Sequence, residues 1–190
     1  SLLTQLDIGE VFTNLQPCQS NICMEVDSLA LMRNTTIKGL QNGMSLQLDP
    51  SVFIEVLAPA SKPLAHQDVN SHSIVLRIRY GTHQFLFMGD GTAFTEYGLI
   101  QSNPMILASD VVKVGHHGST TSSTPEFIQR VMKPNTKAVV SVAERNVYGL
   151  PNENVLARWR YFGATVVETR SEGAIIFIAD AEGVKQVPWR

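Results

Sequence analysis

Polar side chains that could hold a metal ion follow three apolar stretches of the sequence. The stretch "FLFMGD" ends at Asp90, "DVVKVGHHG" carries His116 and His117, and "VVSVAERNVYG" runs on to Asn146 and Tyr148. Each stretch is typical of a strand, and in a sheet covered by helices ligands bind where strand ends converge. One carboxylate and neutral imidazoles suit Zn²⁺ or Mn²⁺, which accept mixed nitrogen and oxygen ligands. The pattern indicates a divalent-metal site, and a carboxylate that bridges two metals would suit phosphodiester chemistry.

The same residues are also typical of turns, and their spacing alone leaves both interpretations open. A Gly-Asp pair at a strand end is most often a turn. Neighbouring side chains of an extended strand face opposite ways, so His116 and His117 cannot both point at one ion unless the chain turns there. Gly115 and Gly118 permit such a turn because glycine tolerates unusual backbone angles.

The elements that must position these residues follow from the hydrophobic periodicity. Strands are predicted at 8–14, 45–49, 52–59, 109–115, 137–142, 165–170 and 173–180, with two more in 73–90 around Gly81–Thr82. Helices are predicted at 25–34, at the start of 91–104, at 124–132 and at 152–163. Thr124 and Asn152 are the expected N-caps, Pro125 the first residue of its helix, and Gly163 a stop. Strands that alternate with helices predict an α/β sheet with helices packed on it.

Composition describes an ordinary globular protein. The 190 residues are 44% hydrophobic and 17% charged, with a formal net charge of -2. No apolar run approaches the roughly 18–20 residues of a membrane span, and no signal-peptide pattern opens the chain. Near-neutral charge argues against a dedicated nucleic-acid clamp, which is usually basic.

Charge is nevertheless unevenly distributed. Residues 1–60 hold six acids against two bases, a net of -4, and residues 113–160 hold seven bases against three acids, a net of +4. The basic stretch either faces phosphate or covers helix faces with solvated side chains.

The two cysteines, Cys18 and Cys23, lie five residues apart in "PCQSNIC". The chain has no third cysteine, and the nearest histidine is His66, so these residues do not predict a structural zinc site. A disulfide and two free thiols both remain open.

Four stretches together resemble a known family. They are "NSHSIVLRIRYGTHQFLFMGD", "SDVVKVGHHGSTTSS", "VVSVAERNVYGLP" and "GATVVETRSEGAIIFIA". In this order they are similar to the C-terminal part of the metallo-β-lactamase-like domain of the ComEC family, the competence proteins of DNA uptake. The resemblance covers residues 66–180, and residues 1–60 fit more loosely. It implies an α/β fold, a metallo-β-lactamase αβ/βα sandwich of four layers, over a single domain of residues 1–190, in which 1–65 is the remainder of the first half and 66–190 the second half.

The resemblance also implies a dinuclear centre of Zn or Mn between the sheets. Asp90 matches the aspartate that bridges the metals, and His116 belongs to the matching histidine pair. His72, in "NSHS", stands where the family more often has asparagine and could add a ligand. Asp90, His116 and His72 are therefore the predicted metal ligands.

The predicted catalytic residues are His117, Ser119 and Tyr148. His117 is the second member of the histidine pair, and Ser119 lies in the turn that follows it. Tyr148 belongs to a segment similar to the family's "NxYGHP", matched here by Asn146, Tyr148, Gly149 and Pro151. In this role His117 or Tyr148 would orient the scissile phosphate or stabilise its charge.

Two departures from the family pattern put a complete site in question. The principal metal motif, "HxHxDH", has no counterpart in residues 1–65, which contain no histidine. The histidine expected between Gly149 and Pro151 is Leu150, which cannot ligate a metal. Either the chain is a fragment that begins after the first metal motif, or it is a degenerate relative.

The leading hypothesis is a metal-dependent hydrolase domain, a phosphodiesterase or nuclease linked to DNA uptake, which is incomplete or impaired as this chain. The resemblance implies two partners, DNA and a membrane-channel portion of the same parent protein, and a place on the outer face of the bacterial inner membrane. The alternative is a non-catalytic module of the same fold that binds DNA or a protein partner. A third option is a hydrolase of small molecules, because this fold hosts many substrates.

Overall fold

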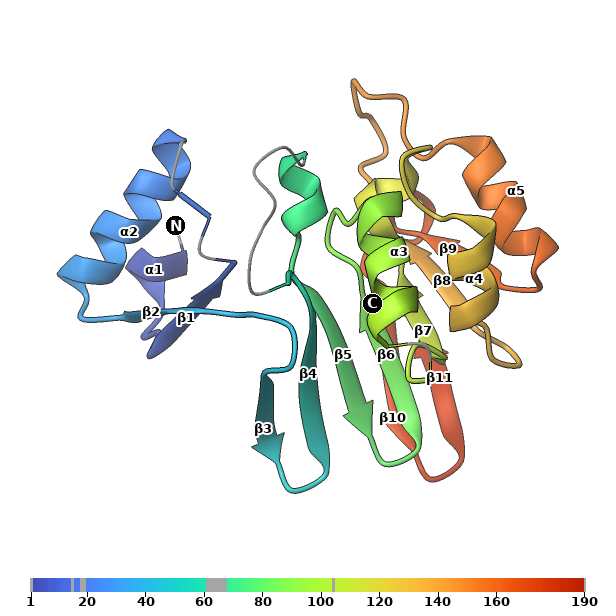
Figure 1. The fold of residues 1–190 in the computed structure, drawn as a ribbon, viewed down its shortest axis with the longest axis horizontal. Coiled ribbons are helices and arrows are strands. Elements are labelled where there is room, and N and C mark those ends of the chain that lie inside the picture. Colours follow the sequence, from blue (N-terminus) through green and yellow to red (C-terminus); the bar gives the residue numbers. More distant parts are fainter. Residues whose placement is uncertain (1, 15, 18–19, 61–67, 104, 190) are drawn as a thin grey trace.

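The computed structural model describes residues 2–14, 16–17, 20–60, 68–103 and 105–189. Within them a seven-stranded mixed sheet has the order β3-β4-β5-β6-β7-β8-β9 (Figure 1). Its strands are β3 (Ser45–Asp49), β4 (Val52–Ala58), β5 (Val75–Tyr80), β6 (His83–Phe87), β7 (Val111–Lys113), β8 (Lys137–Val140) and β9 (Thr165–Glu168). Strands β3 to β6 pair antiparallel, and strands β6 to β9 pair parallel.

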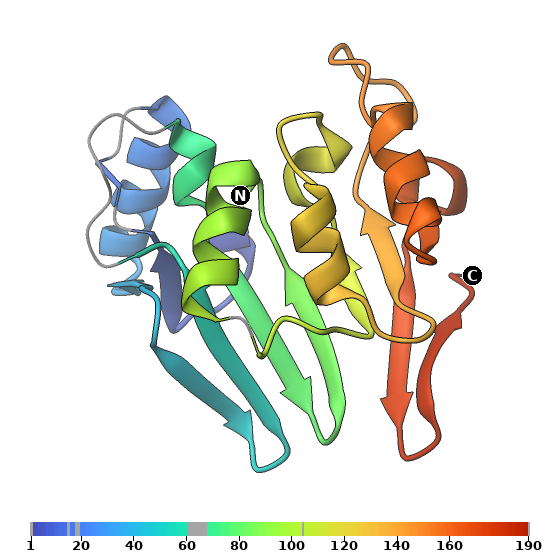
Figure 2. The ribbon, with the colours of Figure 1, turned by 45° about the vertical axis from the view of Figure 1, so that its right-hand side comes forward.

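Three helices cover one face of this sheet (Figure 2). They are α3 (Ala93–Ser102), α4 (Pro125–Val131) and α5 (Glu153–Tyr161). The predicted N-caps are confirmed, because Thr124 Oγ1 accepts a hydrogen bond from the N–H of Phe127 and Asn152 Oδ1 accepts one from the N–H of Asn154. The mixed sheet with its helices confirms the α/β fold class predicted from the sequence.

The main core lies between the sheet and these helices. It is apolar and closed to solvent, with Leu86 and Val112 from the strands and Phe127, Ile128 and Trp159 from the helices all at most 1% exposed. These positions are the buried half of the helical and strand patterns seen in the sequence, which is why the pattern predicts the elements well here.

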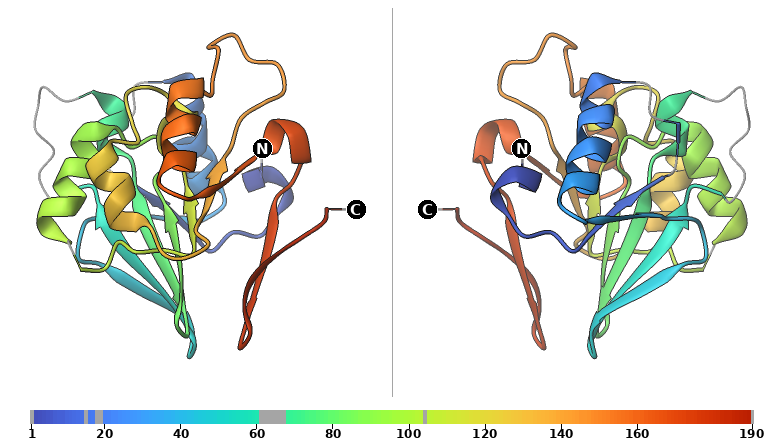
Figure 3. Two further views of the ribbon diagram at one scale, coloured as in Figure 1. Left: turned by 90° about the vertical axis from the view of Figure 1, so that its right-hand side faces the viewer. Right: turned by 90° about the vertical axis from the view of Figure 1, so that its left-hand side faces the viewer.

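A hairpin lies on the opposite side of the sheet from α3 and α4 (Figure 3). It consists of β10 (Ile176–Asp180) and β11 (Gly183–Val187), which pair antiparallel. His83 Nε2 lies 2.8 Å from the carbonyl oxygen of Asp180, which ties the hairpin to β6. The short helix α6 (Thr169–Glu172) joins β9 to this hairpin.

The N-terminal part forms a small parallel β-α-β unit beside β4 (Figure 1). Its elements are α1 (Leu2–Gln5), β1 (Glu10–Thr13), α2 (Asn21–Met32) and β2 (Thr36–Gly39), and β1 pairs with β2. Cys23, in the first turn of α2, is disulfide-bonded. Cys18 lies outside the described residues.

Several elements and their boundaries differ from the sequence prediction. Strands β2 and β11 were not expected, because both are short and partly exposed and lack a run of apolar residues. Helix α2 begins four residues earlier than predicted, since Ser20 caps it by accepting from the N–H of Cys23. The predicted strand 165–170 ends at Glu168, where the chain turns into α6. Residues 61–67 lie outside the described residues, and Val69–His72 forms the 3₁₀ turn η1.

Candidate functional site

The polar segments singled out in the sequence meet at one edge of the main sheet. Strands β6, β7 and β8 are parallel, so their C-terminal ends lie side by side. Asp90 follows β6, the histidine turn (Gly115–Gly118) follows β7, and Ser141 follows β8. This convergence is the arrangement predicted from the three apolar stretches.

Asp90 and His117 face each other at this edge. Asp90 Oδ1 lies 3.3 Å from His117 Nε2, and both side chains are about two-fifths exposed. On the other side of the ring, His117 Nδ1 lies 2.6 Å from the carbonyl oxygen of Ser141. A carbonyl only accepts, so Nδ1 carries the hydrogen, and in the neutral ring the lone pair of Nε2 points at the carboxylate.

This pair has the character of a partial metal site. Two acceptors 3.3 Å apart are favourable only when a proton or a bound cation lies between them or beside them. Histidines that ligate metals usually donate their other ring N–H to a carbonyl or carboxylate, as His117 does to Ser141. Asp90 and His117 therefore fit as two ligands of a divalent ion.

His116 points to different partners. Its Nε2 lies 3.3 Å from Asn70 Nδ2, an amide that donates, so the ring hydrogen belongs on Nδ1. Nδ1 lies 2.8 Å from Thr121 Oγ1, whose hydroxyl in turn donates to Ser119 Oγ. The structure thus brings His117, rather than His116, to Asp90, and the ligand role of His116 stays a prediction.

The backbone of the histidine turn explains why the neighbouring rings diverge. His116 has φ 45° and His117 has φ 52°, the left-handed region that residues other than glycine rarely adopt. The chain does turn here, as the flanking glycines permit. Strained backbone of this kind concentrates at functional sites, where surrounding contacts over-determine it.

The turn η1 and Ser73, which follows it, place polar side chains at the same edge. The hydroxyl of Ser73 accepts from the N–H of Asp90 at 3.1 Å, and the hydroxyls of Ser71 and Thr92 lie 2.9 Å apart. His72 is buried within η1, and its carbonyl accepts from the side chain of Asn14. A ligand role for His72 stays a prediction.

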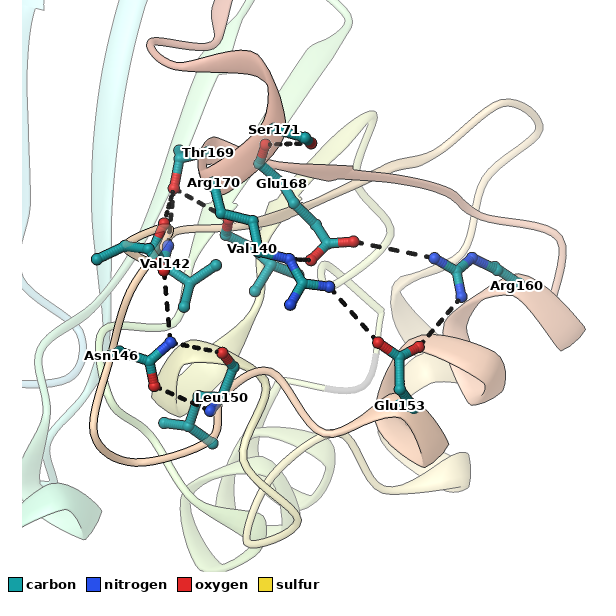
Figure 4. Close-up of polar contacts among 11 residues, drawn as sticks. Val140, Val142, Asn146, Leu150, Glu153, Arg160, Glu168, Thr169, Arg170 and Ser171 are labelled. Carbon is teal, nitrogen blue, oxygen red and sulfur yellow. Dashed lines mark hydrogen bonds and ion pairs between the residues drawn. The ribbon is translucent and has the colours of Figure 1, made fainter.

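The predicted catalytic residues are less close together. Ser119 is held inside its own turn by the N–H and hydroxyl of Thr121. Tyr148 lies in the loop after β8 and is 81% exposed, so its catalytic role stays a prediction. Asn146 shapes this loop with two hydrogen bonds to the backbone of Leu150 (Figure 4).

Sequence reasoning missed Lys113, the last residue of β7. Its ammonium donates to the carbonyl of Gly89 at 2.6 Å and lies 3.9 Å from Asp90 Oδ1. Burial lowers the pKa of Lys113, and the negative charge of Asp90 partly opposes this shift. A lysine that interrupts the apolar stretch "DVVKVG" directly before the histidines was the available signal.

Several basic residues of the second half are paired with acids. Arg170 Nε lies 2.7 Å from Glu168 Oε2, and both Arg160 and Arg170 also approach Glu153 (Figure 4). Lys133 pairs with Asp110 at 2.7 Å. These contacts favour the interpretation that part of the basic stretch stabilises the fold.

Sequence reasoning also missed Glu96 on α3, a carboxylate with no exposed surface. It accepts from the backbone N–H groups of Ser123 and Thr124. Burial raises the pKa of Glu96 above its ordinary value of 4.5, and these hydrogen bonds and the charge of Arg158 partly oppose the shift.

The raised pKa predicts a pH-dependent stability. The folded chain holds a proton on Glu96 more readily than the unfolded chain, so this contribution is full below pH 4.5 and is lost as pH rises through the raised pKa. We expect the free energy of unfolding of the wild type to fall relative to that of Glu96→Gln as pH rises from 4.5 to 8. Urea denaturation of both proteins across this range measures it, and a difference that is independent of pH would contradict it.

The described residues contain no cluster of three or more His, Cys, Asp or Glu side chains arranged to hold a metal ion. They also contain no helix long and apolar enough to cross a bilayer. The fold and the site together define an α/β protein in which a carboxylate and an imidazole face each other at the ends of parallel strands.

Comparisons with known proteins find relatives of this α/β protein. No family model matches the chain. It is 34% identical to ComE operon protein 3 of Bacillus subtilis (strain 168) over 73% of the chain, and 35% identical to the competence protein ComA of Neisseria gonorrhoeae over 70% of it. It is 32% identical to Recombination protein 2 of Haemophilus influenzae over 56% of the chain. These matches confirm the resemblance of the chain to the ComEC-like competence proteins.

The chain spans less than a fifth of the length of these relatives, 17%, 19% and 13% respectively. Among solved structures, a match is the crystal structure of Zn(2+)-bound PqqB from Methylobacterium extorquens. It has a TM-score of 0.48 and 12% sequence identity, and it covers 88% of this chain and 66% of that one.

Proposed function

We propose that the chain carries part of the active site of a metal-dependent hydrolase that cleaves phosphodiesters in nucleic acid during DNA uptake. The observation that carries this proposal is the Asp90–His117 pair, with Nδ1 of His117 fixed by the carbonyl of Ser141. The names of two relatives, a competence protein and a recombination protein, support the link to DNA. The proposed place, on the outer face of the inner membrane, follows from the family resemblance.

The residues at this edge would have different roles in the proposed reaction. Asp90 and His117 would hold a divalent ion, and Ser141 would keep the His117 tautomer that leaves Nε2 free to bind. Lys113 places a positive charge beside Asp90, where it favours an anionic substrate. When bound, the ion would act as a Lewis acid and lower the pKa of a water molecule.

Two ligands do not make a complete site. Catalytic zinc sites usually have three protein ligands and a water molecule. Because the described residues offer Asp90 and His117 without a third member of the cluster, we expect the 190-residue chain alone to be a poor enzyme.

A nuclease assay with Mn²⁺ or Zn²⁺ tests this proposal. We expect slow, metal-dependent cleavage of DNA by the wild-type chain, and its loss in Asp90→Ala and His117→Ala, because each variant removes one of two ligands. Asp27→Ala, which removes an exposed acid on α2, should behave as wild type. Cleavage that is unchanged in Asp90→Ala would contradict the role of Asp90, and two retained metals per chain with rapid turnover would contradict an incomplete site.

The second candidate is a non-catalytic module of the same fold that binds DNA. Leu150 in place of the family's histidine favours it. This module would bind DNA with an affinity that falls as salt rises and does not change with a chelator. The absence of DNA binding at low salt would end this alternative.

A further inference from the structure

The motif that contains the histidines continues into a serine pair, Ser122 and Ser123, for which the proposed chemistry has no use. Both serines are at most 1% exposed. Ser123 has φ 64°, a left-handed conformation that a residue other than glycine adopts only when its surroundings impose it. The contacts of these two residues show what imposes it.

Two helices, α3 and α5, hold Ser123 through hydrogen bonds. From α3, Glu96 accepts the N–H of Ser123 with Oε1 and the N–H of Thr124 with Oε2, the latter at 2.8 Å. From α5, Arg158 Nη1 donates to the carbonyl of Ser123 at 2.5 Å, and Trp159 Nε1 donates to its hydroxyl at 3.0 Å. Backbone donor, backbone acceptor and side chain of one residue are thus all fixed by the core.

Ser122, the neighbour of Ser123, connects this fixed residue to the histidine turn through hydrogen bonds. Its hydroxyl donates to the carbonyl of Gly115 at 2.9 Å and lies 3.1 Å from the carbonyl of Ser119. The N–H of Ser122 also donates to the carbonyl of Ser119. These bonds close the segment 115–122 at both ends, with the two left-handed histidines between them.

We infer that Glu96 is a positioning residue for the candidate site, which acts through Ser123 and Ser122 to hold His117 against Asp90 and Ser141. The inference rests on the proposed function, because it is that function which requires His117 to be held in place. The geometry that it explains is independent of any metal. A buried carboxylate that accepts two backbone N–H groups fixes a loop more strictly than an apolar contact, because losing it leaves two buried donors unsatisfied.

The tautomer of His117 tests this inference directly. Side-chain ¹⁵N NMR of the metal-free full chain should show a single tautomer for wild-type His117, with the hydrogen on Nδ1. We expect Glu96→Ala to produce a mixture of tautomers at temperatures well below its unfolding transition. Glu96→Gln keeps the side-chain size and one of the two acceptor oxygens, so its His117 signal should lie between those of the wild type and Glu96→Ala. Affinity for Mn²⁺ should fall about 10-fold or more in Glu96→Ala.

Glu126→Ala is the matched control, because it removes an exposed glutamate from the first turn of α4 and should leave His117 unchanged. Ser122→Ala covers the case in which Glu96→Ala does not fold, since it deletes only the hydroxyl that reaches Gly115 and should disturb the His117 tautomer in the same way. A wild-type tautomer in a folded Glu96→Ala or Ser122→Ala protein would overturn the inference. A disturbed tautomer in a chain whose wild type binds no Mn²⁺ would uphold it while the proposed function fails.

Discussion

Replacing Gly115 with alanine is expected to destabilise the chain by about 1–3 kcal/mol and to displace the histidine turn. A Cβ atom at this position would lie 2.5 Å from the carbonyl oxygen of Gly91, a distance at which something must shift. The obstacle is backbone at the end of β6, so no side chain can rotate away to make room. Relief therefore requires the turn after β7 to separate from the Gly89–Gly91 segment that carries Asp90.

Thermal and chemical unfolding of Gly115→Ala measure this cost. The matched control is Gly98→Ala, a position in α3 where an added Cβ meets nothing within 4 Å. Alanine in a helix should raise stability there by about 0.5–1 kcal/mol. Equal effects of the two substitutions on the free energy of unfolding would contradict a close contact between Gly115 and the carbonyl oxygen of Gly91.

Replacing Phe127 with alanine is expected to cost about 3–5 kcal/mol of the free energy of unfolding. Phe127 is 1% exposed in α4 and belongs to the core between the helices and the main sheet. Removing the ring leaves a cavity and takes away the packing that holds α4 near Glu96 and Ser123. Phe94→Ala is the control of the same residue type, because Phe94 is 53% exposed. A loss below 1 kcal/mol at Phe127, or an equal loss at Phe94, would contradict this core.

The sequence predicted those parts of the fold that depend on local pattern. Periodicity and turn residues predicted the hairpin around Gly81–Thr82 and the N-caps at Thr124 and Asn152. The convergence of polar residues at the ends of apolar stretches predicted that Asp90 and the histidine turn lie close together. The family resemblance agreed with the relatives found by comparison.

The sequence could not predict which histidine faces Asp90. That choice depends on two left-handed backbone conformations and on the carbonyl of Ser141, 24 residues further along the chain. The sequence also could not predict the role of Glu96, because a glutamate in a helix usually faces solvent. Glu96 can be buried because its carboxylate accepts hydrogen bonds from the backbone N–H groups of Ser123 and Thr124, which come from a different segment.

The central claim is that Asp90 and His117 bind a divalent ion together, and a Zn²⁺ titration followed by side-chain ¹⁵N NMR tests it most directly. We predict that Nε2 of His117 shifts on titration while Nδ1 keeps its hydrogen, and that Asp90→Asn weakens the response. His83, whose Nε2 contacts the carbonyl of Asp180 in the hairpin β10–β11, serves as the internal reference and should not move. If Zn²⁺ leaves His117 unshifted, or shifts it equally in Asp90→Asn, the pair is not a metal site.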